Sequence, residues 1–292
     1  MGKCEKWTIA YRLRKDGATI LDDVQTAFTP IPNTWRYWRA DPFLFENDGK
    51  TYLFAEFYDR ARLRGILGCC ELTDDGAGEW KIILEEPFHL SYPFVYRDGE
   101  EIYMIPESCR AGKIFLYRAT QFPHQWERVR ELADLVAADS TVVDGTDGKY
   151  LITLRTNGQS TQLLAAEMAD GRLKGSMRSI CEPDDLQVRP AGRLFCWRDC
   201  RIRPAQDCSA GYGWGLNFMQ VTQLDRSGYA EHLLKKIRPE DITIRGIQVP
   251  CGIHTYNLTD RYEVIDFKQI EFGLVSKIAG VIRRIKRMLH RT

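Results

Sequence analysis

The chain has 292 residues, with 41 lysines and arginines against 40 aspartates and glutamates. This length suits one large domain or two ordinary ones, and a net charge of +1 argues against a global field that would attract nucleic acid. No apolar run is long enough to span a bilayer, and no apolar signal stretch follows Met1, so we expect a cytoplasmic location and reduced cysteines.

A module of two apolar β-type segments joined by a tight turn recurs about every fifty residues. Each copy opens with a short polar stretch, often followed by Pro, and its second segment ends on a charged residue. Asp-Gly dipeptides supply three of the turns, because Gly adopts positive φ at low cost. The copies span 40–56, 91–107, 138–155, 188–207 and 252–266. A strand-and-turn repeat of this length predicts an all-β fold, a five-bladed β-propeller.

The segments between and around the copies complete the predicted blades. Lys6–Leu13 alternates in polarity and is predicted to be a strand that closes the short fifth blade beside Tyr262–Phe267, and 22–33 looks like a linker. Trp80 and Trp126 precede expected edge strands and are predicted to pack between blades. Outer strands are expected at 66–72, 114–119, 162–168 and 216–224.

The chain divides into a propeller domain at 1–272 and a tail at 273–292. In the tail, apolar residues from Leu274 onward fall at helical spacing and predict a short amphipathic helix. Its other face is basic, with Lys277, Arg283, Arg284, Lys286, Arg287 and Arg291. Two interpretations stay open: a helix packed on the propeller with a solvated basic face, or a helix on an anionic membrane surface. The second would attach the protein to the inner face of the membrane.

The polar residues of the repeat are predicted to ring one pocket. The first strand of each propeller blade lines the central channel, and the second strand ends near the same mouth. Channels are usually filled by small or apolar residues, so ionisable groups in register point to function. The pocket residues predicted in this way are Asp41, Glu56, His89, Ser91, Tyr92, Glu107, Asp139, Arg155, Arg189, Asp207 and His254.

This set suits carbohydrate chemistry. Reaction at a glycosidic bond needs two carboxyl groups, often with a third that tunes their pKa values. Asp41, Glu107 and Asp139 are therefore the catalytic candidates. The remaining residues are candidates for substrate binding. Arg155 and Arg189 could hold a carboxylate, phosphate or diphosphate, Tyr92 and Trp38 could stack on a sugar, and His89 and His254 could hydrogen-bond hydroxyl groups. Glu56, Ser91 and Asp207 complete the set.

Other chemistries lack the residues that they need. No phosphate-binding Gly-rich loop and no zinc motif occurs, so we expect no cofactor and no bound metal, although His89 and His254 have side chains that could ligate a central ion. The Gly-rich segment 211–215 is expected to be a loop at the pocket rim.

The motifs resemble two known groups of proteins. Ala40–Phe45 resembles the opening of the five-bladed family 43 glycosidases. Segments 89–95, 104–108, 205–209 and 252–255 are similar to the N-terminal propeller of plant glucosamine inositolphosphorylceramide transferases and related bacterial proteins. The resemblance covers 34–267 and implies a sugar-sized axial pocket. It also implies that Asp41 is a general base and that Asp139 tunes pKa and orients substrate.

The resemblance has one departure. The glycosidases usually carry their general acid, a Glu, on the fourth blade, whereas the fourth copy here offers Arg189 and Asp207, and Glu107 closes the second. Ordinary hydrolysis is thereby disfavoured. Three hypotheses follow: an intracellular enzyme of glycosyl transfer in glycolipid or surface-polysaccharide biosynthesis, a family 43-like hydrolase, or a non-catalytic sugar-binding module of a transferase complex. Each takes a sugar or sugar phosphate as its partner.

Overall fold

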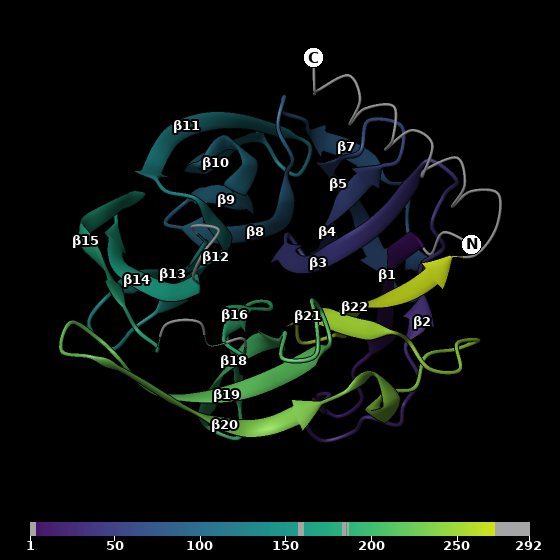
Figure 1. Ribbon diagram of the computed structural model, residues 1–292. Helices are drawn as coiled ribbons and strands as arrows, with labels where there is room; N and C mark the ends of the chain where they lie inside the picture. The colour runs from purple at the N-terminus through teal and green to yellow at the C-terminus, as the bar shows by residue number, and fades with distance from the viewer. Residues whose placement is uncertain (1–3, 157–160, 183–184, 186, 272–292) are drawn as a thin grey trace, which may run out of the picture.

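The computed structural model describes residues 4–156, 161–182, 185 and 187–271. Five antiparallel sheets are arranged around a central axis, which confirms the five-bladed β-propeller (Figure 1). The helix predicted for 273–292 lies outside the described residues. Within the described part of the chain, no helix is long and apolar enough to cross a bilayer.

The inner pairs and outer strands of the blades follow the predicted repeat. Blade one contains β3 (Tyr37–Asn47), β4 (Lys50–Asp59), β5 (Arg64–Thr73), β6 (Gly76–Ala77) and β7 (Lys81–Leu84). Blade two contains β8 (Ser91–Asp98), β9 (Glu101–Glu107), β10 (Lys113–Gln121) and β11 (Gln125–Asp134), with the 3-10 turn η1 (Cys109–Ala111) between β9 and β10. Blade three contains β12 (Ala137–Asp144), β13 (Lys149–Thr156), β14 (Thr161–Ala169) and β15 (Arg172–Ser179).

The last two blades are less regular. Blade four contains β16 (Arg189–Pro190), β17 (Phe195–Trp197), β18 (Cys200–Asp207), β19 (Gly215–Leu224) and β20 (Tyr229–Ile237), and the 3-10 turn η2 (Pro239–Asp241) follows it. Its inner strand is split between β16 and β17, and in that gap Gly192 lies against the next blade: a Cβ there would lie 1.9 Å from the Tyr256 carbonyl oxygen. Blade five contains β21 (Gly252–Leu258), β22 (Tyr262–Glu271), β1 (Cys4–Leu13) and β2 (Thr29–Pro30).

The N-terminal strand closes the ring as predicted. β1 pairs antiparallel with β22 along its whole length, from Cys4 opposite Glu271 to Leu13 opposite Tyr262. The segment expected to be only a linker also contributes β2, a two-residue strand at the outer edge of the same blade. Pro30 is compatible with that place because an edge strand leaves one row of N–H groups unpaired.

The predicted tryptophans pack between blades. Trp126 meets the Phe54 ring of blade one edge-on, with 6.0 Å between ring centroids. Trp80 packs on Phe57 and on a buried cluster that joins blade one to blade five through Ile9 and Val264. These aromatic contacts belong to the core that holds neighbouring blades together.

A bulge repeats in the inner strands and prepares the site. The pairing of β3 with β4, of β8 with β9 and of β12 with β13 shifts at equivalent points. Asp41, Tyr92 and Asp139 occupy those points with φ of 50°, 45° and 54°. In β21 the corresponding shift falls at His254 and Thr255. Because a bulge re-aims the side chains that it leaves unpaired, it accounts for polar groups turned inward from strands that are otherwise apolar.

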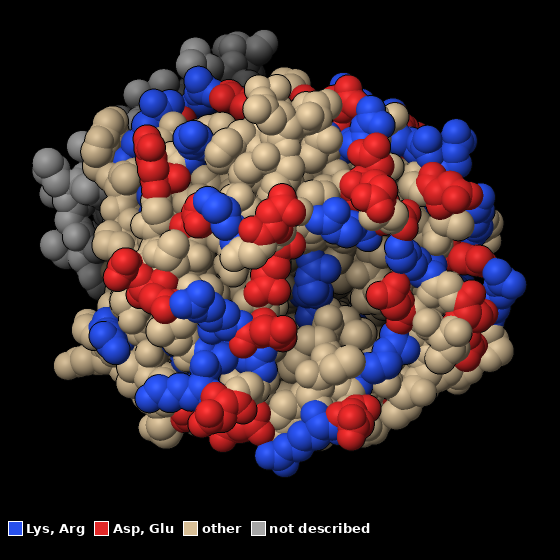
Figure 2. Space-filling view, turned by 180° about the vertical axis from the view of Figure 1, so that it is seen from behind, with Lys and Arg blue, Asp and Glu red and all other residues tan. Residues whose placement is uncertain are grey.

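The charges on the outside of the propeller are mixed. Figure 2 shows lysines and arginines interspersed with aspartates and glutamates around a central hollow on the face turned away from the viewer of Figure 1. No continuous region of one sign covers the described part of that face, in keeping with the net charge of +1.

Candidate functional site

Carboxyl groups from four blades converge at the axis. Asp41, Glu56, Glu107, Asp139 and Asp266 are close enough to affect one another's ionisation. Burial raises the pKa of Glu56 well above its usual value, and the charges of Asp41 and Glu107 raise it further. The structure thus brings together the three carboxylates predicted to be catalytic.

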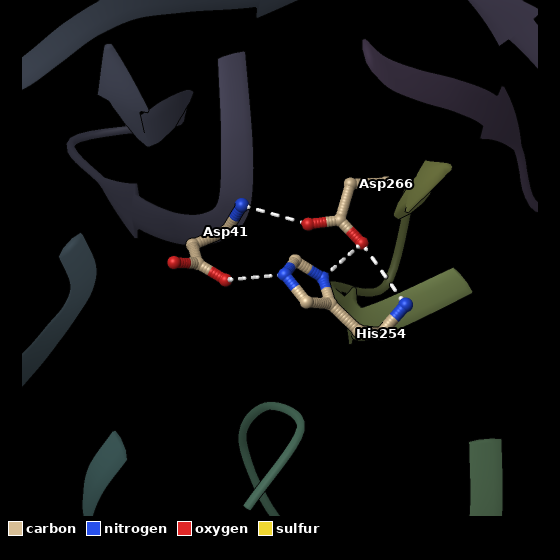
Figure 3. Close-up of side chains that lie close together, drawn as sticks. All are labelled: Asp41, His254 and Asp266. Atoms are coloured by element: carbon tan, nitrogen blue, oxygen red, sulfur yellow. Dashed lines mark hydrogen bonds and ion pairs between the residues drawn. The ribbon is translucent and has the colours of Figure 1, made fainter. Parts of the chain in front are cut away.

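On one side of the site, His254 lies between two aspartates (Figure 3). Its Nδ1 is 2.7 Å from Oδ1 of Asp266, and its Nε2 is 3.7 Å from Oδ1 of Asp41. Asp266 also accepts hydrogen bonds from the backbone N–H groups of Asp41 (2.8 Å), His254 (3.2 Å) and Thr255 (2.9 Å). Asp266 therefore joins blade five to the bulge of blade one and fixes the imidazole.

Aromatic rings hold the same imidazole in place. The Trp7 ring stacks on His254 with 3.7 Å between centroids and 9° between planes, and Tyr212 meets it edge-on at 5.3 Å. Burial lowers the pKa of His254, but the charges of Asp266 and Asp41 outweigh burial and raise the pKa. The N-terminal strand thus both closes the propeller and supports the site.

Asp41 has a raised pKa. Its carboxylate accepts hydrogen bonds from the Tyr92 backbone N–H (3.1 Å) and the Thr255 hydroxyl (3.0 Å). Burial raises the pKa of Asp41 to about 6, His254 opposes that change, and Asp266 and Asp139 add to it. A carboxyl group with such a pKa can accept or release a proton near neutral pH, as general base catalysis requires.

On the other side of the site, Arg189 joins two carboxyl groups. Its Nε is 2.5 Å from Oδ2 of Asp139, and its Nη2 is 3.5 Å from Oε2 of Glu107. Gln206 donates to the same Asp139 oxygen at 3.2 Å. Burial and the neighbouring Asp139 raise the pKa of Glu107 well above its usual value, with Arg189 opposing. The protonated form of Glu107 is thereby favoured beside the Arg189–Asp139 ion pair.

The site opens outward between blades one and two. A cavity of about 760 Å³ is lined in part by Glu107, His89 and Tyr58. His89 accepts a hydrogen bond at Nδ1 from the Gly65 N–H (2.9 Å), and its Nε2 is 3.5 Å from Oε1 of Glu56. Trp38 stacks on Tyr58 with 4.5 Å between centroids, behind the cavity wall. This opening is large enough for a sugar.

A family model described as glucosamine inositolphosphorylceramide transferase 1, N-terminal, matches residues 31–245. The chain belongs to this family. A relative named glucosamine inositolphosphorylceramide transferase 1 from Oryza sativa subsp. indica is 33% identical over 266 residues, which cover 87% of this chain and 34% of the relative. The relative of the same name from Arabidopsis thaliana is 31% identical over 204 residues, covering 66% and 26%. The chain spans about a third of the length of these curated relatives or less.

Solved structures share the fold. An α-L-arabinofuranosidase from Podospora anserina in complex with cellotriose superposes with a TM-score of 0.60 at 12% identity, covering 78% of this chain and 90% of that one. A family 43 β-xylosidase/α-arabinofuranosidase from a compost metagenome, in complex with xylotriose, gives 0.58 at 11% identity, covering 82% and 92%. At this identity the likeness establishes the architecture alone.

Two predicted binding residues of this family member lie away from the pocket. Leu154, not Arg155, has the register position that Glu56 and Glu107 have in their blades, and Arg155 instead reaches Gln162 on β14. In blade four, Gln206 has the equivalent position, opposite Arg189. Successive side chains of a strand point to opposite faces, so a residue one place further along points away from the site.

Asp207 is the second of these residues, and its role is structural. Its carboxylate accepts hydrogen bonds from the Ser209 N–H (2.9 Å) and from Nη2 of Arg238 (2.6 Å). It thereby anchors the loop that leads to Tyr212. That loop lies at the site, as predicted for 211–215, and places Tyr212 5.1 Å from Cζ of Arg189.

Tyr92 and Ser91 do not present a surface to a sugar. Tyr92 is fully buried, and its hydroxyl lies 2.9 Å from the Thr141 hydroxyl and accepts the Gly192 N–H at 2.8 Å. The ring therefore links blades two, three and four across the channel, which corrects the expectation that it stacks on substrate. Ser91 is also buried, opposite Glu107 in the β8–β9 pair.

Four residues at the site were missing from the prediction: Asp266, Gln206, Trp7 and Tyr212. Asp266 ends the fifth copy in the sequence, but the residue paired in the register of Glu56 and Glu107 is Phe267, opposite Ile253, so register alone could not have identified Asp266. Trp7 could not be found in this way either, because it comes from a strand outside the repeat. Tyr212 is 47% exposed and is the better candidate for stacking on a sugar.

One set of side chains has the composition of a cation site. Asp41, His254 and Asp266 place one donor atom each within 4.8 Å of one another. Their oxygens already accept protein hydrogen bonds, and Nδ1 of His254 is engaged by Asp266. A cation here would have to displace these contacts, so the arrangement fits a hydrogen-bonded triad better than a metal centre.

Proposed function

We propose that this chain is the sugar-handling propeller of a glycosyl-transfer reaction that acts on a glycolipid. Three observations support the proposal. The chain belongs to a family whose relatives are named glucosamine inositolphosphorylceramide transferases. Its architecture is that of propellers known as glycosidases. Its axial site places two carboxyl groups with raised pKa values, Asp41 and Glu107, near a carboxylate paired with Arg189, a combination suited to acid–base chemistry at a glycosidic carbon.

In the proposed reaction, Glu107 on one side of the site acts as the acid and Asp41 on the other side acts as the base. Glu107 donates its proton to the leaving oxygen as the bond from that oxygen to the anomeric carbon breaks. The acceptor hydroxyl oxygen forms the new bond to the same carbon, and its proton passes to Asp41. Positive charge that develops on the sugar is stabilised by the Asp139 carboxylate, which Arg189 holds in place at 2.5 Å. With water as the acceptor, the same steps give hydrolysis.

The environment of Glu107 is the strongest support for its role as proton donor. Its side chain is 14% exposed, so it is mostly desolvated yet reaches the cavity. Burial and Asp139 raise its pKa well above the usual value, which favours the protonated form that a proton donor needs. A buried carboxyl group beside an ion pair lowers the stability of the fold, so a purely structural site gains little from it, whereas a proton donor requires it.

A specific observation favours a second candidate, a sugar-binding module without catalysis. Both oxygens of Asp41 accept hydrogen bonds, from Tyr92 and Thr255, and Asp266 accepts four. Saturated carboxylates of this kind can also serve to hold blades together. In that case Glu107 and Tyr212 would bind sugar hydroxyls and a sugar face, and no bond would break.

The two candidates are separated by incubating the full chain with nucleotide sugars, lipid-linked sugars and aryl glycosides and following the products by mass spectrometry. We expect product from the wild type and a loss of about 100-fold or more in Glu107→Gln, the contribution of a positioned acid. Glu101→Gln at the exposed start of the same strand is the matched control and keeps full activity. Sugar binding without product in any arm would contradict catalysis and leave the binding module.

A further inference from the structure

The cavity between blades one and two is unusually rich in arginine. It runs outward from Glu107 and is about 760 Å³ in volume, within the range of small-molecule sites. Blade one contributes Arg62 and Arg64 from the turn into β5, and blade two contributes Arg110 from η1. The space thus extends the axial site past the reacting carbon toward groups attached to the sugar.

The charges around this cavity do not cancel. Arg62 and Arg64 both pair with the carboxylate of Glu85, with 2.7 Å between Nη2 of Arg64 and Oε1. Arg110 is exposed and forms no hydrogen bond or ion pair within the described residues. Asp59 is a second partner of Arg62, with 3.8 Å between its Oδ2 and Nε of Arg62. Three guanidinium groups therefore meet two carboxylates, and Arg110 is the one that has no carboxylate at ion-pair distance among the described residues.

Two further details indicate that this cavity can bind an anion. Nε of Arg64 is buried and has no hydrogen-bond partner. His89, in the same wall, cannot be the source of positive charge because burial, together with Arg110 and Arg64, lowers its pKa to about 4. The imidazole is therefore neutral, chiefly because it is buried, and its Nδ1 already accepts a hydrogen bond from the Gly65 N–H.

We propose that this cavity is an anion subsite, in which Arg110 and Arg64 bind the phosphate ester or carboxylate of the sugar substrate whose glycosidic carbon lies at Glu107. The inference deepens the proposed function and rests on it for the position of the sugar. Guanidinium groups suit this role because they form paired hydrogen bonds with carboxylate and phosphate oxygens. Tyr58, stacked on Trp38, forms an apolar wall on which the rest of the substrate can rest.

The test measures binding of four probes to the full chain by calorimetry: inorganic phosphate, inositol monophosphate, methyl glucuronoside and methyl glucoside. We expect at least one sugar-linked anion to bind more tightly than the neutral methyl glucoside. Arg110→Gln should weaken that anion by about 10-fold or more, the value of a charged hydrogen bond. Arg110 is exposed, so the variant should fold. Arg64→Gln, which also loses the Glu85 contact, should weaken the same probe.

The outcomes distinguish a phosphate from a carboxylate ligand, and the anion subsite from the catalytic proposal. Preference for inositol monophosphate identifies a phosphate subsite, and preference for methyl glucuronoside identifies a carboxylate subsite. Arg172→Gln, an exposed arginine on blade three, is the matched control and should change nothing. Equal affinity for charged and neutral probes, or equal effects of Arg110→Gln and Arg172→Gln, would overturn the subsite. If Arg110→Gln weakens the anion while the wild type turns over no sugar, the subsite stands and the catalytic proposal fails.

Discussion

Replacing Asp41 with asparagine tests the electrostatics of the site. Burial raises the pKa of Asp41 from 3.8 to about 6, so the folded protein binds this proton more tightly than the unfolded chain does. Stability from this group is therefore complete below pH 3.8 and is lost as pH rises through about 6. The difference between the two pKa values corresponds to about 3 kcal/mol of unfolding free energy. The amide of the Asp41→Asn variant cannot ionise and escapes that loss.

The substitution also has a cost that does not depend on pH. The amide NH₂ would face the Tyr92 N–H or the Thr255 hydroxyl, and an unmatched donor costs about 1–3 kcal/mol. The informative quantity is thus the change with pH in the difference between Asp41→Asn and wild type. We expect the variant to gain about 3 kcal/mol relative to wild type between about pH 4 and pH 7.

Urea unfolding followed by tryptophan fluorescence at a series of pH values measures this gain. Asp16→Asn is the matched control, since Asp16 is exposed and has a similar φ of 52°. Asparagine tolerates that backbone region as aspartate does. A difference that is flat with pH, or that falls as pH rises, would refute a raised pKa at Asp41 and with it the role of a base.

Three other predictions concern packing and the tail. Tyr92→Phe should cost about 1–3 kcal/mol in urea unfolding, because the buried Gly192 N–H loses its acceptor; an unchanged free energy of unfolding would mean that the hydroxyl does not tie the blades together. Gly192→Ala should prevent folding or lower the melting temperature steeply, since its Cβ would lie 1.9 Å from the Tyr256 oxygen at φ of 144°; a normal melting temperature would refute that close approach. We also propose that 273–292 binds anionic membranes. The full chain should then co-sediment with anionic vesicles in a salt-sensitive way, and a chain ending at Phe272 should not. Equal sedimentation of the two chains would contradict this proposal.

The period of the sequence was enough to predict the fold. Turn dipeptides and apolar segments recur with little change from blade to blade, because each blade repeats the same packing against its neighbours. Closure by Lys6–Leu13 followed from one short copy and one unassigned strand. The extra strand at Thr29–Pro30 escaped prediction since two residues carry no periodicity.

Site residues could be predicted where the copies of the repeat align residue by residue. They could not be predicted where the alignment shifts by one residue or where the contacts come from other blades. Asp41 and Asp139 occupy the same bulge, so the alignment of copies finds both. Arg155 and Asp207 were misplaced because the copies differ by one residue at their ends, and one residue reverses the direction of a side chain. The burial of Tyr92 depends on partners in two other blades, Thr141 and Gly192, which no local pattern contains.

The proposed chemistry depends on a proton held by Glu107 at neutral pH. Infrared difference spectroscopy of wild type against Glu107→Gln near pH 7 observes that proton directly. We predict that the wild type shows a carboxylic acid carbonyl band that the variant lacks, because burial and Asp139 raise the pKa of Glu107 well above its usual value. A difference confined to ionised carboxylate bands would contradict the assignment of Glu107 as the general acid.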